Sequence, residues 1–152
     1  MWTLLVLVAG CGTPERCGPS EATVLRAIDG DTIELQDGTR VRYLMIDTPE
    51  ITGGKNECYG EEARTANAAL VEGKRIRLAY DVECTDNYDR LLAYVSISGT
   101  EINLRMVERG YACVLYIPPN GEDRVREFEA VELQARSYEI GMWGACEEVA
   151  CD

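Results

Sequence analysis

The 152-residue sequence lacks histidine, and its cations are few. Without an imidazole, neither histidine acid–base catalysis nor a histidine zinc site is possible, which leaves carboxylates, arginines, lysines, tyrosines and thiols. The sequence also lacks low-complexity tracts and any fixed-period repeat, which excludes solenoid and fibrous classes. Fifteen Lys and Arg face 27 Asp and Glu, so the net charge is -12. This charge argues against loose adhesion to nucleic acid but does not exclude a local cationic site.

The first residues carry the features of a targeting segment. Residues 2–9 are apolar, too few to span a bilayer and of the length of a signal-peptide core. The sequence "LVAGC" resembles a bacterial lipobox, so we expect a signal peptide over 1–10, a lipid on Cys11 and a Pro/Gly/Ser-rich tether over 11–22. No Lys or Arg follows Met1, and a buried N-terminal strand is the alternative. We expect an exported protein anchored in the cell envelope, at the outer membrane or the periplasmic face, with secretion as the alternative.

The cysteines support export. If Cys11 carries lipid, an even set remains, and an even set in an exported chain suggests disulfides with 15 possible connectivities. Zinc is the rival reading, but the sequence has no C-x-x-C spacing and no histidine. We favour a Cys58–Cys84 pair, because each cysteine lies just before a predicted functional loop. The six residues are Cys17, Cys58, Cys84, Cys113, Cys146 and Cys151.

Hydrophobic periodicity predicts the order of the elements. Alternating or β-branched runs predict strands, and 3.6-residue periodicity with acidic starts and glycine stops predicts helices. We predict strands at 23–28, 32–36, 40–46, 74–80 and 90–97, helices at 61–72, 101–110 and 122–139, and an extended piece at 111–117. This order favours a mainly β, α+β domain over 23–144: a five-stranded Greek-key barrel of the OB type packed with about three helices, followed by a cysteine-containing tail at 145–152. An all-helical fold fails on the β-branched runs, and a parallel α/β sheet fails because strands and helices do not alternate.

Two carboxylates stand at the ends of predicted strands. Asp31, in "IDGDTI", precedes one strand, and Asp47, in "MIDTPE", ends another. With a backbone carbonyl and waters they would form an all-oxygen site that suits Ca²⁺ or Mg²⁺. The alternative is that "DGD" is a tight turn whose side chains cap backbone amides. The 12-residue spacing of an EF-hand is missing.

Arginines and a third carboxylate extend this pattern. Arg42 lies five residues before Asp47, on a predicted strand whose alternation separates them unless a bulge or twist intervenes. Arg90 opens a strand after a polar loop, and a guanidinium suits bidentate phosphate binding. Glu50 could orient or deprotonate an attacking water. Each residue alone is more often a surface charge, and only the joint arrangement carries weight.

The motifs "AIDGDTIEL", "RYLMIDTPE", "YGEEA", "TDNYDRLLAYV", "EINLRMVERGYA" and "PPN" occur in this order. With them, residues 23–143 resemble the staphylococcal nuclease (thermonuclease) family. The resemblance implies a Ca²⁺-dependent phosphodiesterase that cleaves DNA and RNA with little sequence preference and leaves 3′-phosphate ends. The implied roles are calcium ligands at Asp31, Asp47 and the Thr48 carbonyl, support of the metal shell by Asp29, phosphate binding by Arg42 and Arg90, and management of the attacking water by Glu50.

The sequence departs from the family in the loop before Arg90. Asp89 replaces a usual glycine and adds a negative charge, and Asn87 stands where lysine is common. Tyr88 and Tyr116 are candidate substrate contacts, and a second tyrosine after Tyr116 is missing. A catalytically inactive binding module is the alternative function. We expect a monomer without an obligate protein partner, and we expect Arg42→Ala and Glu50→Ala to fold normally and lose cleavage by several powers of ten.

Overall fold

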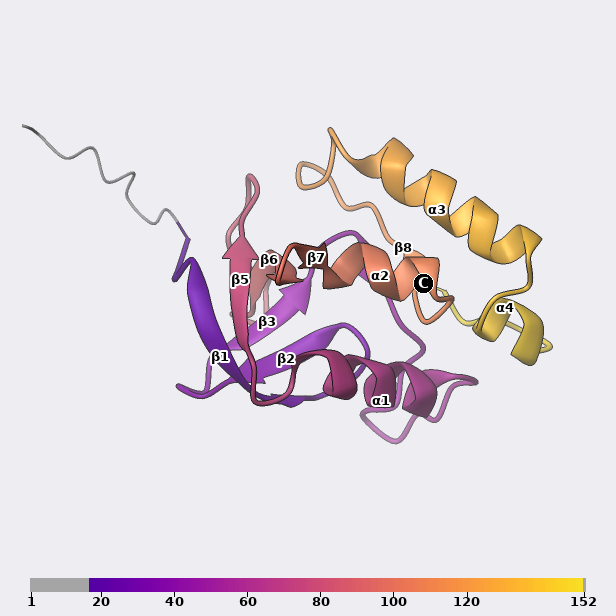
Figure 1. The fold of residues 1–152 in the computed structure, drawn as a ribbon, viewed down its shortest axis with the longest axis horizontal. Helices are drawn as coiled ribbons and strands as arrows, with labels where there is room; N and C mark the ends of the chain where they lie inside the picture. Colours follow the sequence, from indigo (N-terminus) through magenta and orange to yellow (C-terminus); the bar gives the residue numbers. More distant parts are fainter. Residues whose placement is uncertain (1–16, 152) are drawn as a thin grey trace, which may run out of the picture.

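The computed structural model describes residues 17–151, and a closed β-barrel forms their centre (Figure 1). Neighbouring strands pair in the order β3-β2-β1-β5-β6, and a parallel β3–β6 pairing closes the barrel. The other barrel pairings are antiparallel. The five strands are β1 (Glu21–Ala27), β2 (Thr32–Leu35), β3 (Arg40–Tyr43), β5 (Arg75–Ala79) and β6 (Leu91–Ile97).

Helices pack against this barrel. The longer ones are α1 (Gly60–Val71), α2 (Ile102–Glu108) and α3 (Val125–Ser137), and a short α4 (Met142–Ala145) follows. Figure 1 shows α1 and α2 on one face of the barrel, with α3 beyond α2. Outside the barrel, β7 (Thr100–Glu101) pairs antiparallel with β6, and β4 (Ile46–Asp47) pairs with β8 (Cys113–Val114). The predicted α+β barrel of the OB type, with five strands and three main helices, is confirmed; α4 was not predicted.

The apolar alternation of the strands builds the core. In β5, Ile76 and Leu78 are buried while Arg75 and Arg77 are exposed, as a strand with one covered face requires. Met106 of α2 and Phe128 of α3 are fully buried, so both helices contribute to the same core.

The chain segment 40–46 is not the single strand that its apolar run predicts. Tyr43 ends β3, Met45 adopts a positive φ of 69°, and β4 then joins a different sheet. The buried Asn103 side chain stabilises this break by donating to the Leu44 carbonyl, 2.9 Å away. The predicted extended piece 111–117 likewise contains only the two residues of β8. The break redirects the chain between Arg42 and Asp47, which supplies the twist that their convergence requires.

Three disulfides join the six cysteines among residues 17–151. They are Cys17–Cys84, Cys58–Cys146 and Cys113–Cys151. The expected Cys58–Cys84 pair is therefore wrong. Cys58 precedes α1 and lies 6.0 Å, Cα to Cα, from Cys146, which caps α4, whereas Cys84 in the β5–β6 loop lies 5.0 Å from Cys17.

Within residues 17–151, every helix is too short or too polar to cross a membrane. The predicted signal peptide and Cys11 fall outside the described residues.

Candidate active site

Arg42 links two carboxylates at one end of the barrel. It lies on β3, and only 13% of its side chain is exposed. Its Nε is 3.2 Å from Asp31 Oδ1, and its Nη2 donates to Asp47 Oδ1 at 2.9 Å. Its Nη1 donates to the carbonyls of Tyr43 and Ile46 at 2.9 and 2.7 Å. The guanidinium thus holds the β3–β4 break in shape and offsets part of the negative charge of the two carboxylates.

Asp31 is a buried carboxylate with a complete set of donors. Its residue is 5% exposed, and it lies in the turn between β1 and β2. Thr48 donates to Oδ2 through its backbone N–H at 2.9 Å and its hydroxyl at 3.1 Å. The Thr32 hydroxyl donates to Oδ1 at 2.9 Å. These donors and Arg42 offset the cost of burying the charge, so the turn is held as a preformed carboxylate site.

Negative charge is concentrated beside Asp31. Asp29 accepts the Asp31 backbone N–H at 3.0 Å, which forms the turn that the "DGD" sequence also predicts. Burial, and then the charge of Asp31, raise the pKa of Asp29 to about 7. Turn chemistry and a carboxylate cluster therefore coexist here, rather than exclude one another.

Arg90 shares a cavity with Arg42. Arg42 and Arg90 both line a cavity of about 400 Å³, together with the β5–β6 loop and Asn120. Asp86 orients Arg90: its Oδ2 accepts from Nε at 2.7 Å, and its Oδ1 accepts the backbone N–H groups of Tyr88 and Arg90. Burial alone would raise the pKa of Asp86, but these hydrogen bonds outweigh burial and lower it.

The loop before Arg90 accommodates its unusual aspartate. Asp89 has a positive φ of 58°, a conformation that favours glycine and that Asp tolerates better than most residues. The carboxylate bound to Arg90 belongs to Asp86. Sequence reasoning missed Asp86, and its available signal was an Asp four residues before Arg90 in a turn.

Glu50 does not line this cavity; neither do Asp31 and Asp47, but both of these contact Arg42, which does. Its Oε1 accepts from the Ile51 backbone N–H and from both the backbone and the hydroxyl of Thr52. Burial alone would raise its pKa, but the hydrogen bonds from Thr52 and Ile51, with the charge of Lys55, lower it. Glu50 is therefore held as an anion within its own loop.

Two exposed tyrosines are close in sequence to residues that line the cavity. Tyr88 is 80% exposed, and its ring lies 5.3 Å from the Arg90 guanidinium carbon. Tyr116 is 36% exposed, between Leu115 and Ile117, which line the cavity.

Two polar side chains, the buried Asn120 and the partly buried Asp81, fix the two loops that border the cavity, and sequence reasoning missed them too. Asn120, 4% exposed, accepts the Glu83 backbone N–H at 2.8 Å and donates to the Glu83 carbonyl at 3.2 Å. Asp81 accepts the Gly121 N–H at 2.7 Å. The segment after β8 and the β5–β6 loop are thereby joined, which positions Arg90.

The chemistry of the cluster fits a hard cation. Asp31 and Asp47 supply carboxylate oxygens, and the Thr48 hydroxyl lies beside Asp31. Among residues 17–151, no three His, Cys, Asp or Glu side chains converge closely enough to hold a metal by themselves. A cation here would therefore depend on two carboxylates, backbone or hydroxyl oxygens, and water.

The OB-type barrel and its site of arginines and carboxylates together indicate the class of protein to which this chain belongs. The family described as "Staphylococcal nuclease homologue" matches residues 40–145. The chain is 38% identical over 128 residues to endonuclease YncB of Bacillus subtilis, which covers 80% of this chain and 60% of that protein. It is 34% identical over 125 residues to thermonuclease of Staphylococcus intermedius, covering 79% of this chain and 74% of that protein. The chain belongs to the staphylococcal nuclease family.

A third relative shows how partial the match can be. The SPbeta prophage-derived endonuclease YokF of B. subtilis is 36% identical over 130 residues, which cover 81% of this chain but 44% of that protein. The chain thus spans about half the length of the two B. subtilis relatives.

Proposed function

We propose that the protein is a Ca²⁺-dependent nuclease that hydrolyses DNA and RNA with little sequence specificity and leaves 3′-phosphate ends. One observation carries the proposal. Arg42 and Arg90, distant in sequence, line one cavity, while Asp31 and Asp47 contact Arg42. Two guanidinium groups and two carboxylates in this arrangement suit a phosphodiester beside a divalent cation.

The proposed roles follow from the contacts. Arg90, oriented by Asp86, binds the scissile phosphate, and Arg42 stabilises the charge that develops on it. Asp31, Asp47 and the Thr48 carbonyl would hold Ca²⁺ with support from Asp29, and the cation would supply positive charge beside the phosphate. Glu50 orients the attacking water once its carboxylate exchanges its contacts with Thr52 for that water.

Digestion of heat-denatured DNA and of RNA tests this function. We expect cleavage with calcium, none with a chelator, and a loss of roughly 10³-fold in Glu50→Ala. Glu62→Ala is the matched control, because Glu62 is an exposed glutamate in the first turn of α1. Products with 3′-phosphate ends should resist extension by a polymerase until a phosphatase removes the phosphate. Folded protein that binds DNA in chelator but never cleaves it would favour the binding module.

The cell-envelope location is also a proposal. Three disulfides support an oxidising compartment, which is compatible with export and a lipid on Cys11. We propose a monomer anchored at the outer membrane or the periplasmic face. Mass spectrometry of the mature N-terminal peptide tests the anchor, and an unmodified Cys11 on secreted protein would contradict it.

A further inference from the structure

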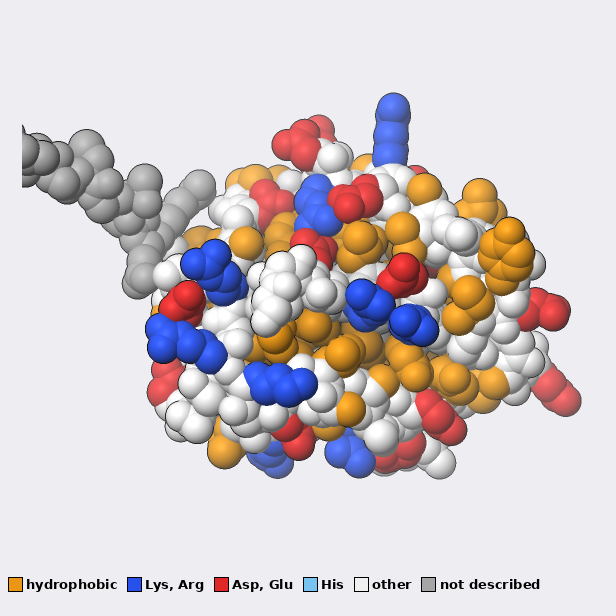
Figure 2. Space-filling view, in the orientation of Figure 1, with side chains coloured by type: hydrophobic (Ala, Val, Ile, Leu, Met, Phe, Trp, Pro, Cys, Tyr) orange, Lys and Arg blue, Asp and Glu red, His pale blue; other side chains and the backbone are white. Residues whose placement is uncertain are grey.

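A second hollow lies between α1 and α2, apart from the cavity of Arg42 and Arg90. This groove has a volume of about 530 Å³, and the two hollows share no lining residue. Figure 2 shows an apolar floor on this face with basic side chains around it. The partly exposed Leu70 and Ile97 line the floor together with the buried Ile102 and Met106, and small residues of α1, such as Ala66, leave the groove open.

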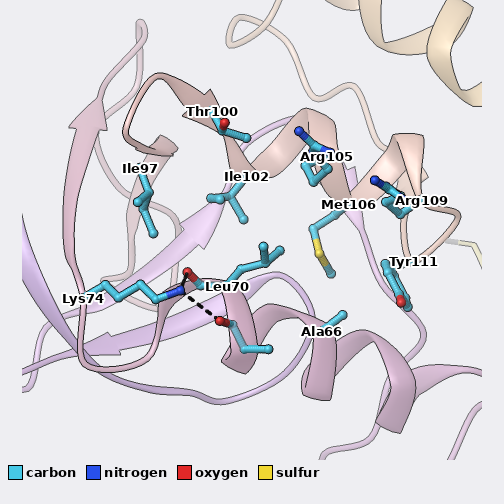
Figure 3. A pocket seen from close by; sticks show the side chains of 11 residues that line it. Ala66, Leu70, Lys74, Ile97, Thr100, Ile102, Arg105, Met106, Arg109 and Tyr111 are labelled. Atoms are coloured by element: carbon cyan, nitrogen blue, oxygen red, sulfur yellow. Dashed lines mark hydrogen bonds between the residues drawn. The ribbon is translucent and has the colours of Figure 1, made fainter.

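Three basic side chains border the groove. Lys74 lies at one end, and Arg105 and Arg109 project from α2 and its C-terminus (Figure 3). Lys74 Nζ donates to the last-turn carbonyls of Ala69 and Leu70, which uses part of its donor capacity. Arg105 has one carboxylate neighbour, Glu108, at 3.4 Å. Arg109 is exposed, and its side chain has no hydrogen-bond or ion-pair partner among residues 17–151.

In a chain of net charge -12, three cations around an apolar floor need an explanation. Arg105 and Arg109 are four residues apart, about 6 Å along a helix axis, so they can contact separate phosphates. Tyr111 lines the groove and stacks on Tyr59, with ring centroids 5.6 Å apart. Cations beside apolar and aromatic surface are the combination that binds single-stranded nucleic acid, with phosphates on the cations and bases on the floor.

We propose that the α1–α2 groove is a second binding site for single-stranded polynucleotide, separate from the cleavage site. The inference rests on the proposed nuclease function and deepens it. A long substrate would occupy the groove and the cleavage site together, whereas a very short one would occupy only one of them. The groove would thus favour long, unpaired strands.

The first test is the salt dependence of binding. The probe is a fluorescent oligothymidylate of about 30 nucleotides in chelator, read by anisotropy. Arg105→Gln/Arg109→Gln removes two phosphate contacts, so the slope of log K against log[salt] should become less negative by about 1.4, with affinity roughly 20-fold weaker at 0.1 M salt. Arg126→Gln is the control, because Arg126 is an exposed arginine on α3 outside the groove. Equal slopes in all three proteins, or no binding by the wild type at low salt, would overturn the proposal.

A second variant guards against indirect effects of the arginine changes. Ala66→Glu places a carboxylate on the floor, and Thr65→Glu adds the same charge at an exposed neighbour. We expect only Ala66→Glu to weaken binding and to lower the ratio of kcat/KM on long strands to kcat/KM on strands of about 4 nucleotides. An unchanged ratio would refute the groove as a polynucleotide site. The same conclusion would follow if Ala66→Glu weakened binding to anionic vesicles but not to the oligothymidylate. Anisotropy measures binding without cleavage. A protein that binds through the groove but never cleaves would therefore refute the proposed function and still support this inference.

Discussion

Replacing Arg42 with alanine should destabilise the protein as well as inactivate it. The side chain is 13% exposed and contacts both Asp31 and Asp47, so its removal leaves two poorly solvated carboxylates without their shared cation. Breaking a buried ion pair costs about 3–5 kcal/mol. Asp31 keeps its hydrogen bonds from Thr32 and Thr48, which places the expected loss at about 3 kcal/mol.

Urea unfolding followed by circular dichroism, in chelator, measures this loss. Arg126→Ala is the control for loss of an exposed arginine and should change the free energy of unfolding by less than about 0.5 kcal/mol. A double-mutant cycle with Asp47→Asn should show a coupling of about 1–3 kcal/mol. A loss below about 1 kcal/mol in Arg42→Ala, or zero coupling, would refute the view that Arg42 holds the carboxylates together. The expectation from sequence, that this variant folds normally, omits these contacts.

Two further predictions concern the framework around the site. Asp86→Asn should lower kcat/KM about tenfold, because Arg90 loses the carboxylate that orients it, while Asp89→Asn should leave kcat/KM unchanged. The pKa of Asp86 is lowered in the folded protein, so its ion pair with Arg90 is present above the ordinary pKa of 3.8 and is lost as the pH falls through the lower folded value. An NMR titration of Asp86 would follow this loss. Cys58→Ser/Cys146→Ser should lower the free energy of unfolding by about 2–5 kcal/mol, as measured in urea, because that disulfide closes the longest loop. Asp86→Asn with full activity, or unchanged stability without the disulfide, would contradict these two accounts.

The strands were predictable because their apolar residues alternate. The barrel was predictable from the order of the elements, five strands with one helix between the third and the fourth. The break at Met45 was not, because a positive φ at a non-glycine residue depends on tertiary contacts such as the Asn103 amide on the Leu44 carbonyl. The disulfides could not be assigned because spacing along the chain does not report distance in space. Cys58 meets Cys146 across 88 residues.

The site could be predicted from the sequence only in part, again because some of its contacts depend on the fold. Strand ends predicted that Asp31 and Asp47 would meet, and both contact Arg42 in the structure. Glu50 follows the same motif, but its loop satisfies it locally through Thr52, an interaction that no pattern of residue types distinguishes from a catalytic one. Its proposed role stays a prediction.

The net charge of the cleavage site explains why substrate binding there would need the proposed cation, whereas binding in the groove would not. Four carboxylates, those of Asp31, Asp47, Glu83 and Asp86, outnumber Arg42 and Arg90, which leaves a net charge of -2, and Asp29 adds to it as it ionises. A phosphate would therefore be repelled from the site until a divalent cation offset this negative charge. Among the described residues, those that line the α1–α2 groove include three cations and no Asp or Glu, so binding there would require no metal. Polynucleotide bound in chelator should then report the groove, and the additional binding that calcium produces should report the cleavage site.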